Sequence, residues 1–248
     1  MAALAFSGIG MQAQQTLTLS TYKGTDLVQY AGKTLNVSVN RYLFNGWNTV
    51  SLPFSMTAAQ VDETFGSDCK LEKLIGVEND GQNIKLNFQD CKAEGIKANT
   101  PYILYYSGQT GSKKFTVENV AVVDAPASVT YTAEGTGETV TMACAKQQQK
   151  SEGLYGIWAK DNVEAAFVNV DGAENGFFAT RCYVQLASGN ATLLTTNHVS
   201  NDVSSIKSVV KPGEQVDVYN LSGVKVANSV ENLQKGIYVV KGKKVLVQ

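Results

Sequence analysis

The sequence has a single histidine and few of the residue patterns that mark catalytic sites. His198 stands near the end of the predicted folded body with no cysteine close by, so neither a Ser–His–Asp triad nor a Cys–His pair has a well-placed base. No GxSxG, HExxH or P-loop motif occurs, nor a GxGxxG between a strand and a helix. We therefore expect a non-enzymatic protein that needs no cofactor.

Charged residues are also scarce. They make up 17% of the chain, and the net charge is −1, so no strongly basic surface exists to attract nucleic acid or an anionic membrane. No apolar run approaches the roughly 20 residues that a membrane-spanning helix needs. The apolar content of 44% is nevertheless sufficient for a packed core. We expect a globular protein with no nucleic-acid partner and no membrane span.

Carboxylates are present, but not in the arrangement that glycoside hydrolysis requires. That reaction uses two carboxylates that face each other across the sugar. The candidate acids all fall in predicted turns or on the predicted helix, where acids commonly form turns and caps. These acids are Asp62, Glu63, Glu164, Asp171 and Glu174. A hydrolase on a sandwich scaffold is therefore the least favoured of three functional hypotheses.

Short β-strand patterns, in contrast, are abundant. From Gln15 onward, apolar and polar residues alternate, and strand-forming runs of about five to eight residues recur every 8–12 residues or so. Only one helix is predicted, over residues 58–65, where Thr57 and Gln60 match a capping box and Gly66 ends the helix. The pattern predicts an all-β fold, with a large antiparallel β-sandwich over residues 14–198.

The two ends of the chain differ from this body. Residues 1–13 are small and apolar, and they stop at Ala13, which is typical of a signal peptide. Residues 199–213 are rich in Ser, Asn and Val and indicate a linker. Residues 214–248 alternate β-forming residues around Gly turns, which predicts two hairpins in a small C-terminal β domain.

The order of residues in this tail resembles a known family. The segments VYNLSGVKV and LQKGIYVVKGKKVLVQ are similar to the C-terminal sorting domain of Bacteroidota secreted proteins, the type A signal of the type IX (Por) secretion system. The matching positions include Tyr219, Gly223, Gly236, Tyr238 and Lys244. The resemblance implies recognition by the secretion machinery and a secreted or cell-surface location. The alternative is a plain β-hairpin domain without a sorting role.

The body is similar to another group of proteins, more loosely. The segments WNTVSLPFSMTAAQVDETFG, ANTPYILYY, GLYGIWA and GFFATRCYVQL resemble a β-rich module of Bacteroidota surface and secreted proteins. This resemblance implies a fold and a location, but no chemistry.

Four cysteines in a chain expected to be exported predict two disulfides. Cys69 and Cys91 flank a predicted hairpin with an Asp80–Gly81 turn, and a bulge or a three-residue turn would place them opposite each other. Cys144 and Cys182 then form the second pair by elimination. The alternative is four buried, reduced thiols. The spacing contains no CxxC pair, so we expect no metal site.

Aromatic residues on or beside the predicted strands are the one feature that suggests a ligand. Trp47, Trp158 and Tyr155 would form a carbohydrate-binding platform if their flat faces were exposed. Aromatic residues in strands, however, more often belong to the core. We favour a secreted or surface interaction module with an adhesin-like role, whose candidate partners are surface proteins or polysaccharide. A carbohydrate-binding module is the second hypothesis.

Overall fold

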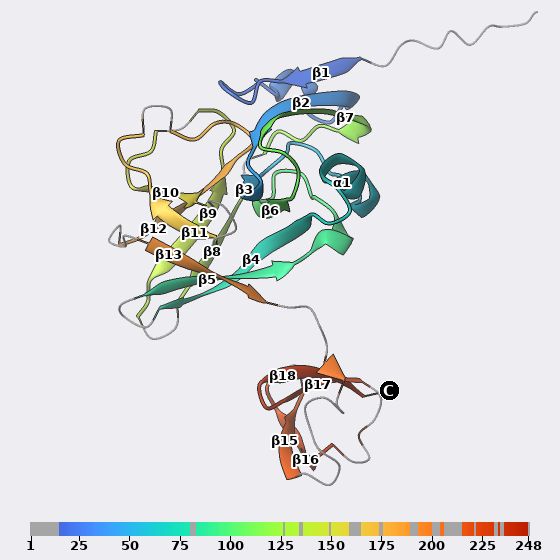
Figure 1. Cartoon of the computed structure of the whole chain (residues 1–248), viewed down its shortest axis with the longest axis vertical. Helices are drawn as coiled ribbons and strands as arrows, with labels where there is room; N and C mark the ends of the chain where they lie inside the picture. Colours follow the sequence, from blue (N-terminus) through green and yellow to red (C-terminus); the bar gives the residue numbers. More distant parts are fainter. Residues whose placement is uncertain are drawn as a thin grey trace, which may run out of the picture. The chain divides into compact units, whose positions relative to one another are not determined.

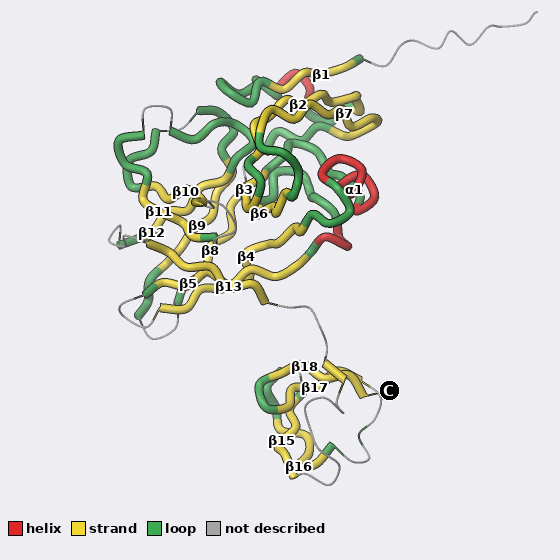
Figure 2. Tube along the Cα trace, in the orientation of Figure 1, coloured by secondary structure: helices red, strands yellow, loops and turns green. Residues whose placement is uncertain are grey.

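The computed structural model confirms an all-β fold (Figure 2). It describes residues 15–247 apart from 80–82, 126, 134–135, 149, 159–164, 174–175, 189–192, 200–203, 206–214, 221, 231–232 and 234–235. The predicted signal peptide lies outside the described residues, as does most of the predicted linker. Two compact units are present, up to Val199 and from Ser200 onward, so each is described by itself.

The first unit contains thirteen strands among its described residues, with one α-helix and two short 3₁₀ helices (Figure 1). The strands are β1 (Thr16–Leu19), β2 (Thr34–Leu43), β3 (Gly46–Val50), β4 (Lys70–Asn79), β5 (Ile84–Asp90), β6 (Tyr102–Tyr106), β7 (Gly111–Ala121), β8 (Ser128–Thr132), β9 (Thr139–Cys144), β10 (Leu154–Trp158), β11 (Ala166–Asn169), β12 (Cys182–Leu186) and β13 (Leu193–Val199). The helices are α1 (Ala58–Phe65), η1 (Val28–Tyr30) and η2 (Lys92–Glu94).

These strands form two sheets. The smaller sheet has the order β1-β2-β7, and the larger has the order β3-β6-β4-β5-β13-β11-β10-β12-β9-β8. The sandwich is not purely antiparallel, because β1 runs parallel to β2 and β13 runs parallel to β5. The large sheet curls. The Tyr131 hydroxyl on β8 donates to the Leu74 carbonyl on β4, and the Cys182 N–H on β12 donates to the Thr49 hydroxyl on β3.

Two hydrophobic cores follow from this arrangement. One lies where the small sheet and α1 meet β3, β4 and β6, and it includes Val37, Phe54 and Phe65. The other lies inside the curled large sheet and includes Phe88 and Tyr155. The predicted helix is confirmed with its bounds: the Gln60 N–H donates to the Thr57 hydroxyl, and the Thr57 N–H donates to the Gln60 side chain.

The hairpin between β4 and β5 differs from the prediction. A two-residue Asp80–Gly81 turn would pair Val77 with Ile84, whereas the structure pairs Val77 with Leu86 and Asn79 with Ile84. A longer connection therefore joins the strands, although residues 80–82 lie outside the described residues. A bulge between Leu74 and Gly76 shifts the register again farther along.

The second unit is a five-stranded sheet with the order β14-β18-β17-β15-β16. Its strands are β14 (Ser204–Ser205), β15 (Gln215–Tyr219), β16 (Lys225–Ser229), β17 (Gly236–Val240) and β18 (Lys243–Val247). The short strand β14 falls within the predicted linker, yet it pairs with β18. Val218, Val240 and Val245 are fully buried in its small core.

Across the described part of the chain, no helix has the length and apolar character needed to cross a membrane.

Candidate functional site

The first unit contains a groove of about 610 Å³, which we call the aromatic groove. It lies between the end of β2, the turn that follows β1, and the connection from β11 to β12. Its walls carry five aromatic residues, Tyr22, Tyr42, Phe44, Phe177 and Phe178. A cleft of this size with apolar walls and a few polar groups is typical of a small-molecule or oligosaccharide site.

Three aromatic residues of the groove are unusually exposed. Tyr22 is 53% exposed, Tyr42 46% and Phe44 48%, and they are the only aromatics among the exposed large hydrophobic residues of the described chain. Tyr22 stacks on Phe178 with ring centroids 4.5 Å apart, and Tyr42 meets Phe44 edge to face at 5.2 Å. The rings therefore form two supported pairs that leave flat apolar area open to a ligand.

Local backbone geometry fixes the turn that carries Tyr22. Gly24 has a φ of +93° and forms an isolated bridge with Gln147. A Cβ at this position would lie 2.6 Å from the Lys146 carbonyl oxygen, so no other residue fits without a backbone shift. The bridge anchors the Tyr22 side of the groove.

Two arginines lie on the floor of the same groove. Arg41 on β2 is only 3% exposed, and its Nη1 and Nη2 donate to the Thr180 and Thr49 carbonyls at 2.9 and 2.6 Å. Its Nε has no hydrogen-bond partner. Arg181 is half-buried, and its Nη2 donates to the Tyr42 carbonyl at 2.9 Å.

Neither guanidinium has a counter-ion in the part of the chain that the structure describes. Among the described residues, no carboxylate lies within ion-pair distance of Arg41 or Arg181. Burial and the adjacent Arg181 lower the pKa of Arg41 to about 9, and burial also lowers the pKa of Arg181. An opposite charge in the groove would reverse both effects, because it favours the protonated guanidinium.

Thr180, between these arginines in the groove wall, is held in a strained conformation. Its φ is +68°, which is a genuine outlier for a β-branched residue. Three backbone hydrogen bonds fix it: its N–H donates to the Ala145 carbonyl, and its own carbonyl accepts from the Ser51 N–H and from Arg41. Strain of this kind concentrates at functional sites.

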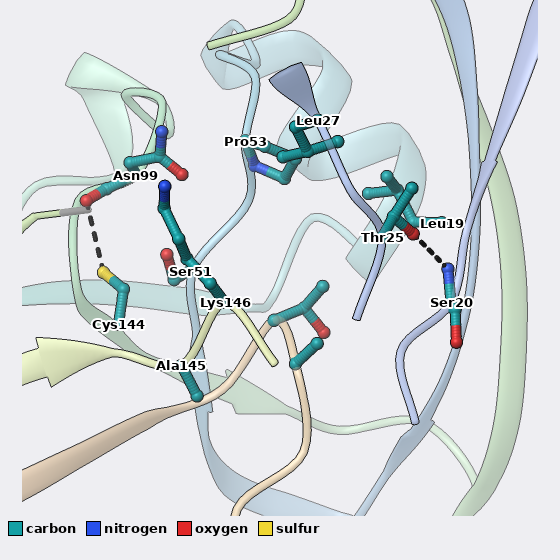
Figure 3. Close-up of a pocket in the computed structure, with 12 residues that line it drawn as sticks. Leu19, Ser20, Thr25, Leu27, Ser51, Pro53, Asn99, Cys144, Ala145 and Lys146 are labelled. Atoms are coloured by element: carbon teal, nitrogen blue, oxygen red, sulfur yellow. Dashed lines mark hydrogen bonds between the residues drawn. The ribbon is translucent and has the colours of Figure 1, made fainter. Parts of the chain in front are cut away.

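A second, much smaller pocket of about 30 Å³ shares Thr180 with the groove (Figure 3). The Cys144 thiol lies at this pocket and donates to the Asn99 carbonyl at 3.2 Å. The space holds roughly one water molecule, so it is too small for a ligand.

Of the residues considered for sugar binding, Trp47 and Tyr155 do not line the aromatic groove. Tyr155 is fully buried and Trp47 is 9% exposed, so neither meets the condition of an open aromatic face. Trp47 stacks on His198 at 4.6 Å, and both Trp47 and Tyr155 lie in the core of the large sheet. The backbone of Trp158 lies in β10, and its side chain lies outside the described residues.

The two predicted disulfides are also absent, since all four cysteines are free and buried. The β4–β5 bulge places Cys91 beside Leu71, to whose carbonyl both its N–H and its thiol donate, and so leaves Cys69 out of register. Cys144 and Cys182 do face each other across β9 and β12. The Cys144 thiol donates to the Asn99 carbonyl, and the Cys182 thiol donates to the Val50 carbonyl.

The single histidine is held by a buried acid. Its Nδ1 lies 2.6 Å from a carboxylate oxygen of Glu72, which is 5% exposed. No group of three or more His, Cys, Asp or Glu side chains within the described residues could hold a metal ion.

The tail residues singled out by the resemblance occupy the small second unit. Tyr219 ends β15, Gly223 takes a φ of +76° in the next turn, and Gly236 begins β17. Tyr238 packs against the core of this unit, while the side chain of Lys244 lies outside the described residues.

Sequence reasoning missed Tyr22, Phe44, Phe178 and both groove arginines. One signal was available: Arg41 and Arg181 are the only two arginines in the sequence, whereas every other basic side chain apart from His198 is a lysine.

Comparisons with protein-family models, with curated proteins and with solved structures found no match for this chain.

Proposed function

We propose that this chain is a non-enzymatic binding module, exported to the cell surface or the medium, whose aromatic groove holds a carbohydrate chain. The observation that carries the proposal is the clustering of the exposed aromatic side chains: Tyr22, Tyr42 and Phe44 all face one groove. Flat aromatic faces stack on the apolar faces of sugar rings, which makes them the usual platform for such ligands.

Polar groups around the aromatic rings suit the same ligand. Thr21, Asn40 and Ser112 line the groove beside them. Neutral hydroxyl and amide groups can donate to and accept from sugar hydroxyls. A groove with aromatic walls and neutral polar groups thus supports carbohydrate over a purely apolar ligand.

The proposed location depends on the tail and not on the groove. The tail sequence resembles a type IX sorting domain, and it folds as a separate small unit. We infer that the tail directs export and that the first unit carries the binding activity.

A glycan-array assay of the full chain tests the binding proposal. Tyr42→Ala removes one exposed face, while Val28→Ser changes a still more exposed apolar side chain outside the groove. We expect the wild type and Val28→Ser to bind the same glycans and Tyr42→Ala to lose about tenfold in affinity or more. Absence of binding to any glycan by folded wild-type protein would contradict the proposal.

A further inference from the structure

The groove has a second property that its aromatic walls do not explain: it collects two arginines that have no counter-ion among the described residues. The chain has 21 basic Lys and Arg residues, and only two of them are arginine. Both arginines, Arg41 and Arg181, line the aromatic groove. Arginine presents a planar fork of donors that matches a carboxylate or a sulfate, which lysine does not.

The surroundings of these arginines leave the charge uncompensated. Elsewhere in the described chain, the half-buried Lys73, Lys92 and Lys146 have acidic partners, as in the Lys146–Asp124 pair at 2.6 Å. The arginines contact carbonyl oxygens only: Thr180 and Thr49 for Arg41, and Tyr42 for Arg181. A buried charge is costly unless it is paired, so an unpaired pair of like charges needs a reason.

The two guanidinium groups have different roles in this arrangement. Arg181 is the more exposed, and Nη2 is the only one of its donors that has a partner among the described residues. Its other donors are available to a ligand. Arg41 is more deeply buried, and its Nε has no hydrogen-bond partner. Its charge adds positive potential to the groove. Thr180 directly precedes Arg181, and its strained backbone, with a φ of +68°, fixes the position from which the Arg181 side chain extends.

From this geometry we infer that the aromatic groove selects an acidic glycan, with Arg181 binding a carboxylate or sulfate group of a sugar stacked on the aromatic rings. The inference rests on the proposed carbohydrate-binding function and specifies its ligand class. The uronate carboxylate and the sulfate ester share the same chemistry, a fixed anion with two or more acceptor oxygens on a sugar ring. Arg41 is a positioning residue that raises the local potential.

A matched ligand pair tests the inference with the full chain. An oligogalacturonide and its methyl ester have the same backbone and differ only in the charge of the carboxyl groups. We expect the acid to bind about tenfold tighter or more than the ester, because charge-assisted hydrogen bonds are roughly twice as strong as neutral ones. The preference should weaken as the salt concentration rises. A sulfated oligosaccharide and its desulfated form, run in parallel, distinguish sulfate from carboxylate.

Variants of Arg181 identify the residue responsible. Arg181→Gln should abolish the preference for the acid while retaining binding to the methyl ester, and Arg181→Lys should restore part of it. Lys33→Gln, which removes an exposed charge outside the groove, should leave the preference unchanged. Thermal unfolding of each variant shows that it is folded, and Arg181 is chosen over Arg41 because it is less buried.

Each outcome decides at least one of the two proposals, carbohydrate binding by the aromatic groove and its selectivity for an acidic glycan. A clear preference for either anionic ligand that Arg181→Gln removes supports the inference. Equal binding of charged and neutral forms overturns it but leaves the proposed function standing. No binding of any oligosaccharide by folded protein overturns both, and binding of an acidic peptide in their place would overturn the glycan assignment.

Discussion

Two sets of aromatic residues in the first unit differ in burial: one set is buried and the other is exposed. Trp47 and Tyr155 are each the second residue of a strand, β3 and β10, and both are buried in the core of the large sheet. Tyr42 is the last but one residue of β2, Phe44 follows that strand and Tyr22 lies in a turn, yet these three rings are about half exposed. The comparison shows that packing against the core of the large sheet, more than residue type or distance from a strand end, decides which aromatic residues can meet a ligand.

The largest expected effect is on the buried set. Tyr155→Ala should lower the free energy of unfolding by about 3–5 kcal/mol, because it removes a large, fully buried side chain and leaves a cavity. Urea denaturation of the full chain measures this. A loss below about 1 kcal/mol would show that Tyr155 is not a core residue. The contrast between buried and exposed aromatic residues would then not hold.

An intermediate effect is expected at the backbone that holds Tyr22. Gly24→Ala introduces a Cβ 2.6 Å from a carbonyl oxygen at a φ of +93°, so it should destabilise the fold by about 1–3 kcal/mol and weaken glycan binding. Gly32→Ala is the matched control, since its φ is +77° and its Cβ would meet nothing within 4 Å. If both variants bind glycan as the wild type does, the Gly24 bridge does not shape the groove.

The exposed set should behave in the opposite way from Tyr155. Tyr42→Ala and Phe44→Ala should each change the free energy of unfolding by less than about 1 kcal/mol, because these side chains are about half exposed. The same denaturation experiment provides the value. A loss as large as that of Tyr155→Ala would mean that these rings serve the core and not a ligand.

The smallest effect concerns the thiols and involves no loss of stability. Hydrogen bonds from the Cys182 thiol and then from Ser51 lower the pKa of Cys144, whereas burial raises the pKa of Cys91 to about 12. Since the thiolate is the reactive form, iodoacetamide at pH 8 should label Cys144 before Cys91 in the native protein. Mass spectrometry gives the order. Earlier labelling of Cys91 would contradict this arrangement of thiols.

Much of the fold could be predicted from local sequence patterns. The period-two alternation gave an all-β fold, and the Thr57–Gln60 capping box gave the helix with its correct ends. These features depend on a few neighbouring residues. The β4–β5 register could not be predicted in the same way, because the bulge at Leu74–Gly76 and the longer connection shift it without a clear local signal.

The aromatic groove could not be predicted from the sequence for a different reason. Tyr22, Tyr42 and Arg181 line the same groove but are distant in sequence. They come together only because the end of β2 lies beside the connection between β11 and β12. Aromatic strand residues can be identified from sequence, but which of them remain uncovered depends on the order of strands in the curled sheet. The scarcity of arginine was visible, yet its meaning required knowing that Arg41 and Arg181 share one groove.

The most direct test of the account is isothermal titration calorimetry of the full chain with the glycan that binds best on the array. Wild type, the Tyr42→Ala/Phe44→Ala double variant and Val28→Ser are compared. The account predicts that the double variant loses about tenfold in affinity or more, or roughly 1.4 kcal/mol, while Val28→Ser binds as the wild type does. Equal affinity for all three proteins would contradict the claim that the aromatic groove is the binding site.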